Sequence, residues 1–350
     1  MTLPTALRGK MRLPVIGAPL FIVSTPELVI AQCKAGIVGS FPSLNARPRE
    51  MLGEWLTQIG TALAEHDRKH PDTPAAPYAV NLVAHKSNGR LEHDLALCVR
   101  HKVPVVITSL GARSELNEAV HAYGGLVLHD VISNRHAKSA VSKGADGVIA
   151  VAAGAGGHAG ATSPFALVQE IRSWFSGPLV LAGAIANGQA ILAAQVMGAD
   201  LAYLGSAFIA THEANAVAEY KQMLTECGAE DIIYTNYFSG VLGNFLRPSL
   251  VASGLDPDQL APRDKTDITF AATDESDAPR RWKTIWGAGH GIAAIRNIPP
   301  AGELVARLAR EYAHACSTSA VISAHWAGSV AAQQAWAANN ATRRVAEASL

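Results

Sequence analysis

Gly147-Val148-Ile149-Ala150-Val151 runs directly into Ala152-Ala153-Gly154-Ala155-Gly156-Gly157-His158-Ala159-Gly160, and these residues say most about the architecture of the chain. The first part is a short apolar run of the kind that forms a strand buried on both faces. The second part has only glycine and alanine around one histidine, so its backbone can approach a flat or phosphorylated ligand closely. We therefore expect a buried strand that ends in a ligand-binding loop, with His158 projecting into the space that the glycines leave.

The composition is that of a globular protein with one large core. The chain has 350 residues, 49% of them hydrophobic, and a formal net charge of zero, so neither a nucleic-acid partner nor a membrane surface is expected. Cys33, Cys98, Cys227 and Cys316 are far apart, which argues against a disulfide framework and against a metal site. The start of the chain lacks a signal-peptide core and no apolar run reaches the roughly 18 residues of a membrane helix, so we expect a cytoplasmic protein.

Short apolar runs alternate with longer amphipathic segments between about residues 13 and 212. The expected strands are Leu13–Ala18, Ile37–Ser40, Tyr78–Leu82, Val105–Ser109, Leu126–Asp130, Gly147–Val151, Leu179–Ala182 and Leu201–Leu204. The expected helices are Thr25–Lys34, Arg47–Glu65, Leu91–His101, Glu115–Tyr123, Ser133–Lys143, Phe165–Phe175 and Gly188–Met197. Strands separated by single helices run parallel, and eight of them wound in one direction predict a (β/α)8 barrel.

The alternation stops after Ala210. Residues 213–282 contain one helix-like segment, then aromatic and turn-rich sequence, and finally a polar tract from Asp264 to Arg281. We expect this segment to be an inserted cap or lid domain after the eighth strand. The barrel domain would then comprise residues 1–212 and 283–350, with the last helical part packing back on the barrel.

The glycine-rich loop also matches a dinucleotide-binding fingerprint, Gly154-Ala155-Gly156-Gly157-His158-Ala159. A Rossmann helix would begin inside that motif, whereas Gly160 and Pro164 delay any helix to about Phe165. A loop at the carboxyl end of a barrel strand fits better, because barrel active sites lie at that face. His158 is then the candidate catalytic residue, since imidazole exchanges protons near neutral pH.

Further loops follow other expected strands. Ala182-Gly183-Ala184 after the seventh strand and Gly205-Ser206-Ala207 after the eighth predict a phosphate cradle of backbone amides. Gly17-Ala18-Pro19-Leu20 ends the first strand with small residues that suit a planar ring. Asn81 ends the third strand and either pairs with a ring edge or caps the strand; His129 and Asp130 at the fifth are weaker candidates.

With these residues the chain resembles the nitronate monooxygenases (2-nitropropane dioxygenases), a family of FMN-dependent barrel enzymes. The likeness spans about Leu13 to Thr211 and returns at Trp286-Gly287-Ala288-Gly289, where Gly287 replaces the family's usual serine. Its most specific part is Gly156-Gly157-His158-Ala159-Gly160, which matches the family's catalytic-histidine loop. The resemblance implies cofactor contacts at Gly17, Ala18, Pro19, Leu20, Asn81, His129, Gly156, Gly157, Gly160, Ala182, Gly183, Ala184, Gly205, Ser206, Ala207, Trp286 and Gly289.

The resemblance also implies an activity. A nitronate would be oxidised with O2 to a carbonyl compound and nitrite, with His158 acting as the base toward a nitroalkane or holding the anionic nitronate. Tyr234, Tyr237 and Phe238 would close over the substrate or else form a small core of the insertion. The expected assembly is a monomer or a homodimer.

Three alternatives share this framework. The first is an FMN-dependent NAD(P)H reductase of quinones or enoyl thioesters, which has the same barrel and flavin. The second, a dehydrogenase of the inosine-monophosphate type, needs a cysteine in the sixth-strand loop, and none of the four cysteines is there. The third is a barrel that binds flavin or a phosphosugar without catalysis.

Overall fold

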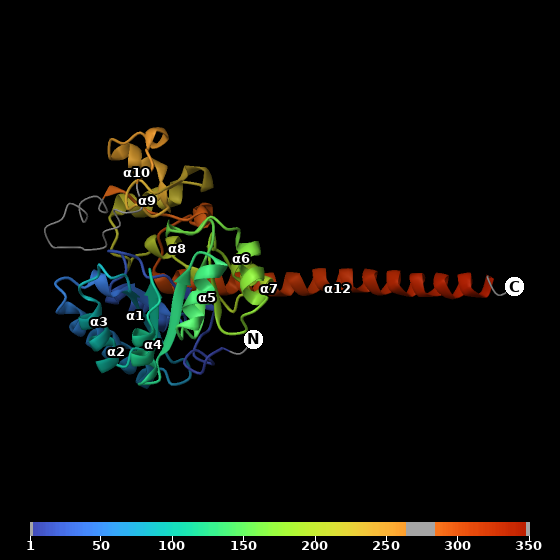
Figure 1. Ribbon diagram of the computed structural model, residues 1–350, viewed down its shortest axis with the longest axis horizontal. Helices are drawn as coiled ribbons and strands as arrows, with labels where there is room; N and C mark the ends of the chain where they lie inside the picture. The colour runs from blue at the N-terminus through green and yellow to red at the C-terminus, as the bar shows by residue number, and fades with distance from the viewer. Residues whose placement is uncertain (1–2, 264–283, 348–350) are drawn as a thin grey trace.

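The computed structural model describes residues 3–263 and 284–347, except for the side chains of residues 331–332 and 335–347 (Figure 1). The expected polar tract from Asp264 to Arg281 lies outside the described residues.

Eight parallel strands form the centre of the molecule, as predicted. They are β1 (Val15–Gly17), β2 (Gly39–Pro42), β3 (Tyr78–Val83), β4 (Val105–Ser109), β5 (Leu126–Val131), β6 (Gly147–Val151), β8 (Leu179–Ala182) and β9 (Leu201–Leu204). The helices between them are α1 (Pro26–Lys34), α2 (Met51–Lys69), α3 (Leu91–Arg100), α4 (Ser114–His121), α5 (Asn134–Ser142), α6 (Pro164–Arg172) and α7 (Gly188–Met197).

The strand order is β1-β9-β8-β6-β5-β4-β3-β2, and the two ends of this sheet meet. A parallel bridge joins Ile16 of β1 to Val38 just before β2. The amide of Gly17 donates to the carbonyl of Val38 at 2.8 Å, and the amide of Val38 donates to the carbonyl of Val15 at 3.2 Å. The predicted (β/α)8 barrel is therefore confirmed.

Alternate side chains of each strand fill the barrel, because successive residues of a strand point to opposite faces. Ile16, Ile107, Leu128 and Ile149 belong to this interior cluster and are fully buried. Leu7 joins them from the N-terminal segment, also without solvent exposure. Since the interior is packed with side chains, a ligand has room only at an end of the barrel.

A second, smaller sheet lies at the carboxyl end of the strands. After α8 (Ser206–Ile209), α9 (Ala218–Glu226) and a 3-10 turn (Ala229–Asp231), the antiparallel strands β10 (Ile232–Thr235) and β11 (Gly243–Leu246) pair with β7 (Gly157–His158). The chain continues through α10 (Arg247–Ala252) and two 3-10 turns (Pro257–Gln259 and His290–Ala294). Figure 1 shows α9 and α10 together on one side of the barrel. That residues 213–282 form a domain separate from the barrel stays a prediction.

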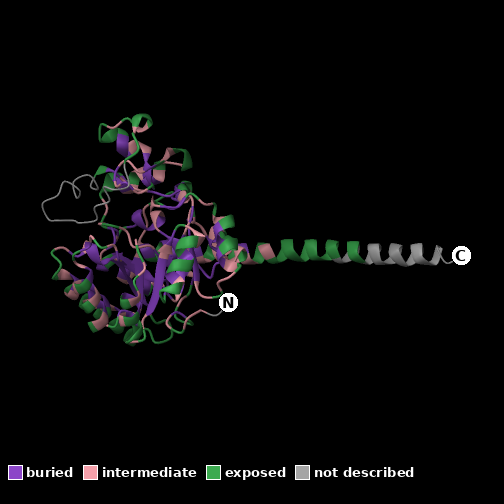
Figure 2. Ribbon diagram, viewed as in Figure 1, coloured by how far each residue is buried: buried purple, intermediate pink, exposed green. Residues whose placement is uncertain are grey.

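The last helix, α12 (Ala301–Glu347), is 47 residues long. Its first turns pack against α1 and α7, as expected. The remainder does not pack back on the barrel and projects away from it, so the sequence-based expectation was wrong for this part (Figures 1 and 2). Across the part of the chain that the structure describes, no helix has both the length and the apolar character that a bilayer crossing requires.

Gly188 sets how closely α12 approaches α7. A Cβ atom at this position would collide with the backbone of α12 at Glu311 and Tyr312. The Gly188 amide also donates to Oε2 of Glu311 at 2.9 Å, and the Tyr312 hydroxyl donates to Oε1 of Gln195 at 2.5 Å. These contacts anchor the long helix to the barrel.

We expect Gly188→Ala to lower the free energy of unfolding by about 2 kcal/mol, because the clash is with backbone that cannot rotate away. Gly302→Ala is the matched control: no atom lies within 4 Å of a Cβ there, and alanine favours a helix. Urea denaturation of both variants measures the difference, and equal stability of the two would contradict the close approach.

Candidate active site

A cavity of about 1890 Å³ opens at the carboxyl end of the barrel strands. Strand-end loops form its floor and walls, and the segments around β10, β11 and residues 285–291 border it from the other side. Ligand pockets commonly measure about 300–1,000 Å³, so this one has room for a cofactor together with a substrate. Its place agrees with the position of active sites in (β/α)8 barrels.

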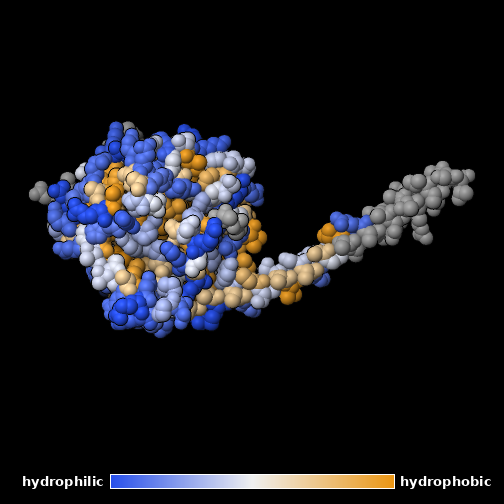
Figure 3. Space-filling view, turned by 90° about the horizontal axis from the view of Figure 1, so that it is seen from below, coloured by the Kyte–Doolittle hydropathy of each residue, from blue (hydrophilic) through white to orange (hydrophobic). Residues whose placement is uncertain are grey.

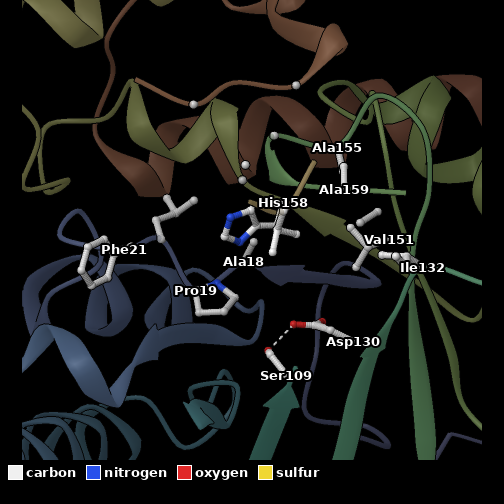
Figure 4. Close-up of a pocket in the computed structure, with 18 of the residues that line it drawn as sticks. Ala18, Pro19, Phe21, Ser109, Asp130, Ile132, Val151, Ala155, His158 and Ala159 are labelled. Atoms are coloured by element: carbon white, nitrogen blue, oxygen red, sulfur yellow. Dashed lines mark hydrogen bonds between the residues drawn. The ribbon is translucent and has the colours of Figure 1, made fainter. Parts of the chain in front are cut away.

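His158 projects into this cavity toward the segment with Ala18 and Pro19 (Figure 4). It lies on β7, whose pairing with β11 sets Gly243 opposite His158 and Asn244 opposite Gly157. Nε2 of His158 lies 2.8 Å from the hydroxyl of Ser239, in the loop between β10 and β11. The orientation of the imidazole therefore depends on both the barrel and the inserted segment.

Glycines make this pairing possible. A Cβ on Gly243 would lie 2.9 Å from the carbonyl oxygen of Gly157. One on Gly156 would lie 2.9 Å from the amide nitrogen of Gly289. Side-chain atoms do not occur this close to backbone, so the loop requires glycine at these points.

Burial lowers the pKa of His158 to about 4, because a charged imidazole would lose its hydration there. The ring is therefore neutral at pH 7. A neutral imidazole can accept a proton or donate one hydrogen bond, and these are the two roles expected from the sequence.

Three polar side chains from neighbouring strands form a chain on the cavity floor. Nδ2 of Asn81 donates to Oγ of Ser109 at 2.7 Å, and Oγ of Ser109 donates to Oδ2 of Asp130 at 2.6 Å (Figure 4). Desolvation raises the pKa of Asp130 to about 6 against the opposing effect of the Ser109 hydrogen bond. The floor thus holds a carboxyl group that takes up a proton more readily than usual.

Two polar atoms of the floor have no hydrogen-bond partner among the described residues. They are Oδ1 of Asp130 and the hydroxyl of Tyr203, both of which are inaccessible to solvent. Burial, and the nearby Asp130 carboxylate, raise the pKa of Tyr203 well above its usual value, so that its hydroxyl keeps its proton. An acceptor and a donor are therefore available to a ligand that enters the cavity.

Backbone hydrogen bonds tie the glycine loops together. The carbonyl of Gly154 accepts from the amides of Ala184 and His290 at 3.1 and 2.9 Å, and Oγ of Ser206 accepts from the amide of Gly289 at 2.9 Å. Gly183 and Ala184 both have positive φ, at 136° and 54°. The loops after β6, β8 and β9 therefore form one connected wall.

The charge of the lining favours an anion. Among the described residues that border the cavity, Asp130 is the one carboxylate, whereas Arg47, Arg135 and Lys143 carry permanent positive charges. Phosphate groups and small organic anions gain from such surroundings.

Most of the residues expected from the sequence border the cavity. They are Ala18, Pro19, Leu20, Asn81, His129, Gly156, Gly157, His158, Gly160, Ala182, Gly183, Ala184, Gly205, Ser206, Tyr234, Trp286 and Gly289. The structure thus brings these residues to one cavity, and their individual roles stay predictions.

Four expected residues do not border it. Gly17 packs against the buried side chain of Gln32, and Ala207 lies in the core between the barrel and α12. Tyr237 and Phe238 pack edge to face and, with Phe245, form a small core of the inserted segment. For these two aromatic residues the structure agrees with the alternative expectation of a core rather than with a substrate contact.

At the end of β5 the geometry favours Asp130 over His129. Nδ1 of His129 lies 2.5 Å from the hydroxyl of Thr108, and burial lowers the pKa of His129 to about 4. Because Leu128 belongs to the barrel interior, the strand alternation turns Asp130 inward and His129 outward.

Sequence reasoning missed several residues of the site. Ser109 ends β4 and Tyr203 lies on β9, so the inward alternation of strand-end polar residues could have identified both. Tyr220 stacks on Trp286 with ring centroids 4.9 Å apart, and Ser239 bonds to His158. No local pattern marks these two residues, because their partners are far away in the chain.

Comparison with known proteins places the chain in a family. The profile described as "Nitronate monooxygenase" matches residues 59–311. The nitronate monooxygenase of Paraburkholderia phytofirmans is 29% identical over 85% of this chain and 92% of its own length, and that of Pseudomonas aeruginosa is 27% identical over 85% and 95%. A (3aS,4S,5R,7aS)-5-hydroxy-7a-methyl-1-oxo-octahydro-1H-indene-4-carboxyl-CoA dehydrogenase from Rhodococcus jostii is 28% identical over 72% and 68%.

Solved structures agree on the fold. A nitroalkane oxidase from Streptomyces ansochromogenes superimposes with a TM-score of 0.74, at 24% identity over 90% of this chain and all of the other. FabK from Thermotoga maritima superimposes with a TM-score of 0.73, at 21% identity over 91% and 97%. Since the family profile covers well over half of the sequence, the chain belongs to the nitronate monooxygenase family, a family of flavin-dependent oxidoreductases.

Proposed function

We propose that this protein binds FMN in the cavity and oxidises nitronates with O2 to a carbonyl compound and nitrite. The observation that carries the proposal is the neutral imidazole of His158, held by Ser239 and facing a cavity with an unpartnered acceptor and donor on its floor. The family of the chain supports the reaction type, and the cationic lining supports an anionic substrate.

The residues of the cavity fit FMN. The edge of an isoalloxazine ring offers one N–H donor between two carbonyl acceptors, which complements Oδ1 of Asp130 and the hydroxyl of Tyr203. Small residues at Ala18 and Pro19 leave space for a flat ring, and the loops at Gly183 and Gly205 would hold the phosphate. Bound there, FMN would supply electron acceptance from the substrate and electron transfer to O2.

The chain itself provides proton handling and orientation. The imidazole of His158 would accept the proton from the carbon of a neutral nitroalkane, or donate a hydrogen bond to an oxygen of an anionic nitronate. The contact between Nε2 and the Ser239 hydroxyl fixes the plane of the imidazole ring, so that the ring meets the substrate in one orientation. Because the pKa is lowered to about 4, the imidazole is unprotonated throughout the neutral range and its free nitrogen can accept a proton.

The inserted segment would exclude water above the substrate. Tyr234 borders the cavity, and its hydroxyl donates to the carbonyl of Ala159 at 2.8 Å, next to His158. The stacked pair of Tyr220 and Trp286 borders the same space, with the Tyr220 hydroxyl bonded to the carbonyl of Gly287. We assign Tyr234 to the substrate side of the cavity on this basis.

One observation favours a second candidate, an FMN-dependent NAD(P)H reductase of quinones or enoyl thioesters. The cavity of about 1890 Å³ is large for a small nitronate, and it is also bordered by two cations, Arg135 on α5 and Lys143 directly after that helix. A phosphate-bearing nicotinamide or thioester would use both the space and the charges.

The proposal predicts a yellow protein whose flavin is reduced by propionate 3-nitronate without oxygen. We expect His158→Ala to retain FMN and to lose about 100-fold or more in turnover of a neutral nitroalkane, because the carbon of that substrate must give up a proton before oxidation and general-base catalysis contributes that much. His314→Ala, at an exposed position on α12, is the control and should keep the full rate. Absorption spectroscopy and steady-state oxygen consumption measure these effects.

A protein that refuses added FMN would overturn the proposal, and so would an unchanged rate in His158→Ala. Rapid reduction of the flavin by NADPH, together with no reduction by the nitronate, would select the second candidate instead.

A second prediction concerns Asp130 in the protein without cofactor. With a pKa of about 6 in the folded state and 3.8 unfolded, this group binds more protons when folded, so it lowers stability as pH rises from about 4 to 6. Asparagine cannot ionise. Asp130→Asn should therefore match the wild type near pH 3.5 and exceed it by roughly 2 kcal/mol at pH 7.5, since about 1.4 kcal/mol per pKa unit is an upper bound at a cavity wall.

Urea denaturation at the two pH values tests this difference. Asp72→Asn, at an exposed position, serves as the control and should follow the wild type at both. A variant at position 130 that is no more stable at pH 7.5 would show that the carboxyl group is not held in a desolvated site.

A further inference from the structure

A seven-residue repeat runs through α12. Residues at alternating spacings of four and three share one stripe of the helix, which is the pattern of a coiled-coil seam. They are Ala301, Val305, Leu308, Tyr312, Ala315, Ser319, Ile322, Trp326, Ser329 and Gln333, and the sequence continues the spacing at Trp336 and Asn340.

The two halves of this stripe differ in their surroundings. Leu308 is fully buried and Ala315 is 7% exposed, because this half packs against the barrel helices. Ile322 and Trp326 occupy equivalent positions further along and are 54% and 63% exposed. Figure 2 shows the same change from buried to exposed along the helix, and Figure 3 shows apolar side chains on the surface of its projecting part.

The projecting part, Cys316–Glu347, is called the arm below. At about 1.5 Å per residue it extends for nearly 50 Å. A helix with no tertiary contacts gains little from propensity alone, and Gly328 and the β-branched residues Val321 and Ile322 weaken it further. The arm therefore needs a partner surface that covers the stripe.

The charge pattern of the arm restricts that partner. The sequence has no Asp, Glu, Lys or Arg between Glu311 and Arg343, which is about nine turns of helix. Helices that lie on membranes carry Lys and Arg on their polar face, and a charged protein partner would require matching charges. An uncharged helix fits best against another uncharged helix of the same length.

We propose that the arm of one chain packs along the arm of a second copy, so that two molecules form a homodimer joined by a coiled coil. Self-pairing meets no like-charge repulsion here, since the seam and its flanks carry no permanent charge between Glu311 and Arg343. A two-fold axis brings the same surface of each copy together. Ser319, Ser329 and Gln333 place polar groups within the seam, which is how coiled coils select register and number of strands.

The arrangement is independent of the cofactor and of the reaction. The arm starts where α12 leaves the barrel, beyond the contact of Tyr312 with Gln195, whereas the cavity opens at the carboxyl ends of the strands.

Sedimentation equilibrium of the full-length protein tests the proposal. At micromolar concentrations we expect twice the mass of one chain. Ile322→Glu and Trp326→Glu should each give the mass of one chain. We expect the dissociation constant of the dimer to rise at least about 100-fold, because an unpaired carboxylate would be buried in the seam. Val321→Glu is the matched control: Val321 is 71% exposed and lies about 100° around the helix from Ile322, so the dimer should persist.

Circular dichroism and FMN titration show that the barrel of each variant is folded. The proposal is overturned by a wild type that stays a single chain at the highest soluble concentration, or by dimers that survive Ile322→Glu and Trp326→Glu. It is equally overturned if Val321→Glu dissociates the dimer to the same extent, or if the single chain binds lipid vesicles through the arm.

Discussion

The backbone pairing between β7 and β11 is the constraint on which the site depends. Two residues of the loop after β6, Gly157 and His158, become an edge strand of the inserted sheet. The lack of a side chain at Gly243 lets β11 approach this strand closely. Without this pairing, a loop made of glycine and alanine would leave the imidazole of His158 without a fixed direction. The barrel supplies the position of the histidine, and the insertion supplies its orientation through Ser239.

Burial acts in opposite directions on two titratable groups that border the cavity, His158 and Asp130. It lowers the pKa of His158 and raises that of Asp130, because in both cases the charged form loses hydration. Near neutral pH the histidine is therefore an uncharged base, while Asp130 remains close to its point of titration. The permanent charge of the site comes from Arg47, Arg135 and Lys143, so an anionic cofactor or substrate is favoured without help from the imidazole.

Local sequence patterns predicted the barrel and much of the cavity wall. Apolar runs of strand length locate the eight strands of the barrel, since each is buried on both faces and can be recognised without its neighbours. The glycine-rich loops around Gly156 and Gly183 can also be recognised locally, because their composition does not depend on residues far away in the chain. Ser239 and Tyr220 could not be identified, because their partners His158 and Gly287 lie more than sixty residues away. The projecting arm was missed because the apolar stripe of α12 looks alike whether the barrel or another chain covers it.

The barrel and the inserted segment form different parts of the cavity, and this bears on substrate specificity. Asn81, Ser109, Asp130 and Tyr203 lie on strands whose alternation is fixed by the packed interior, so the floor of the cavity cannot change without disturbing the core. The roof comes from the β10–β11 hairpin and the 285–291 segment, which contact the barrel loops through the β7–β11 pairing and through the hydrogen bonds of Gly154 with His290 and of Ser206 with Gly289. Because function resides in the site rather than in the fold, changes confined to this roof would alter the substrate without altering the barrel. Selection for substrate is therefore expected to reside in residues such as Tyr234, and the chemistry in residues such as His158 and Asp130.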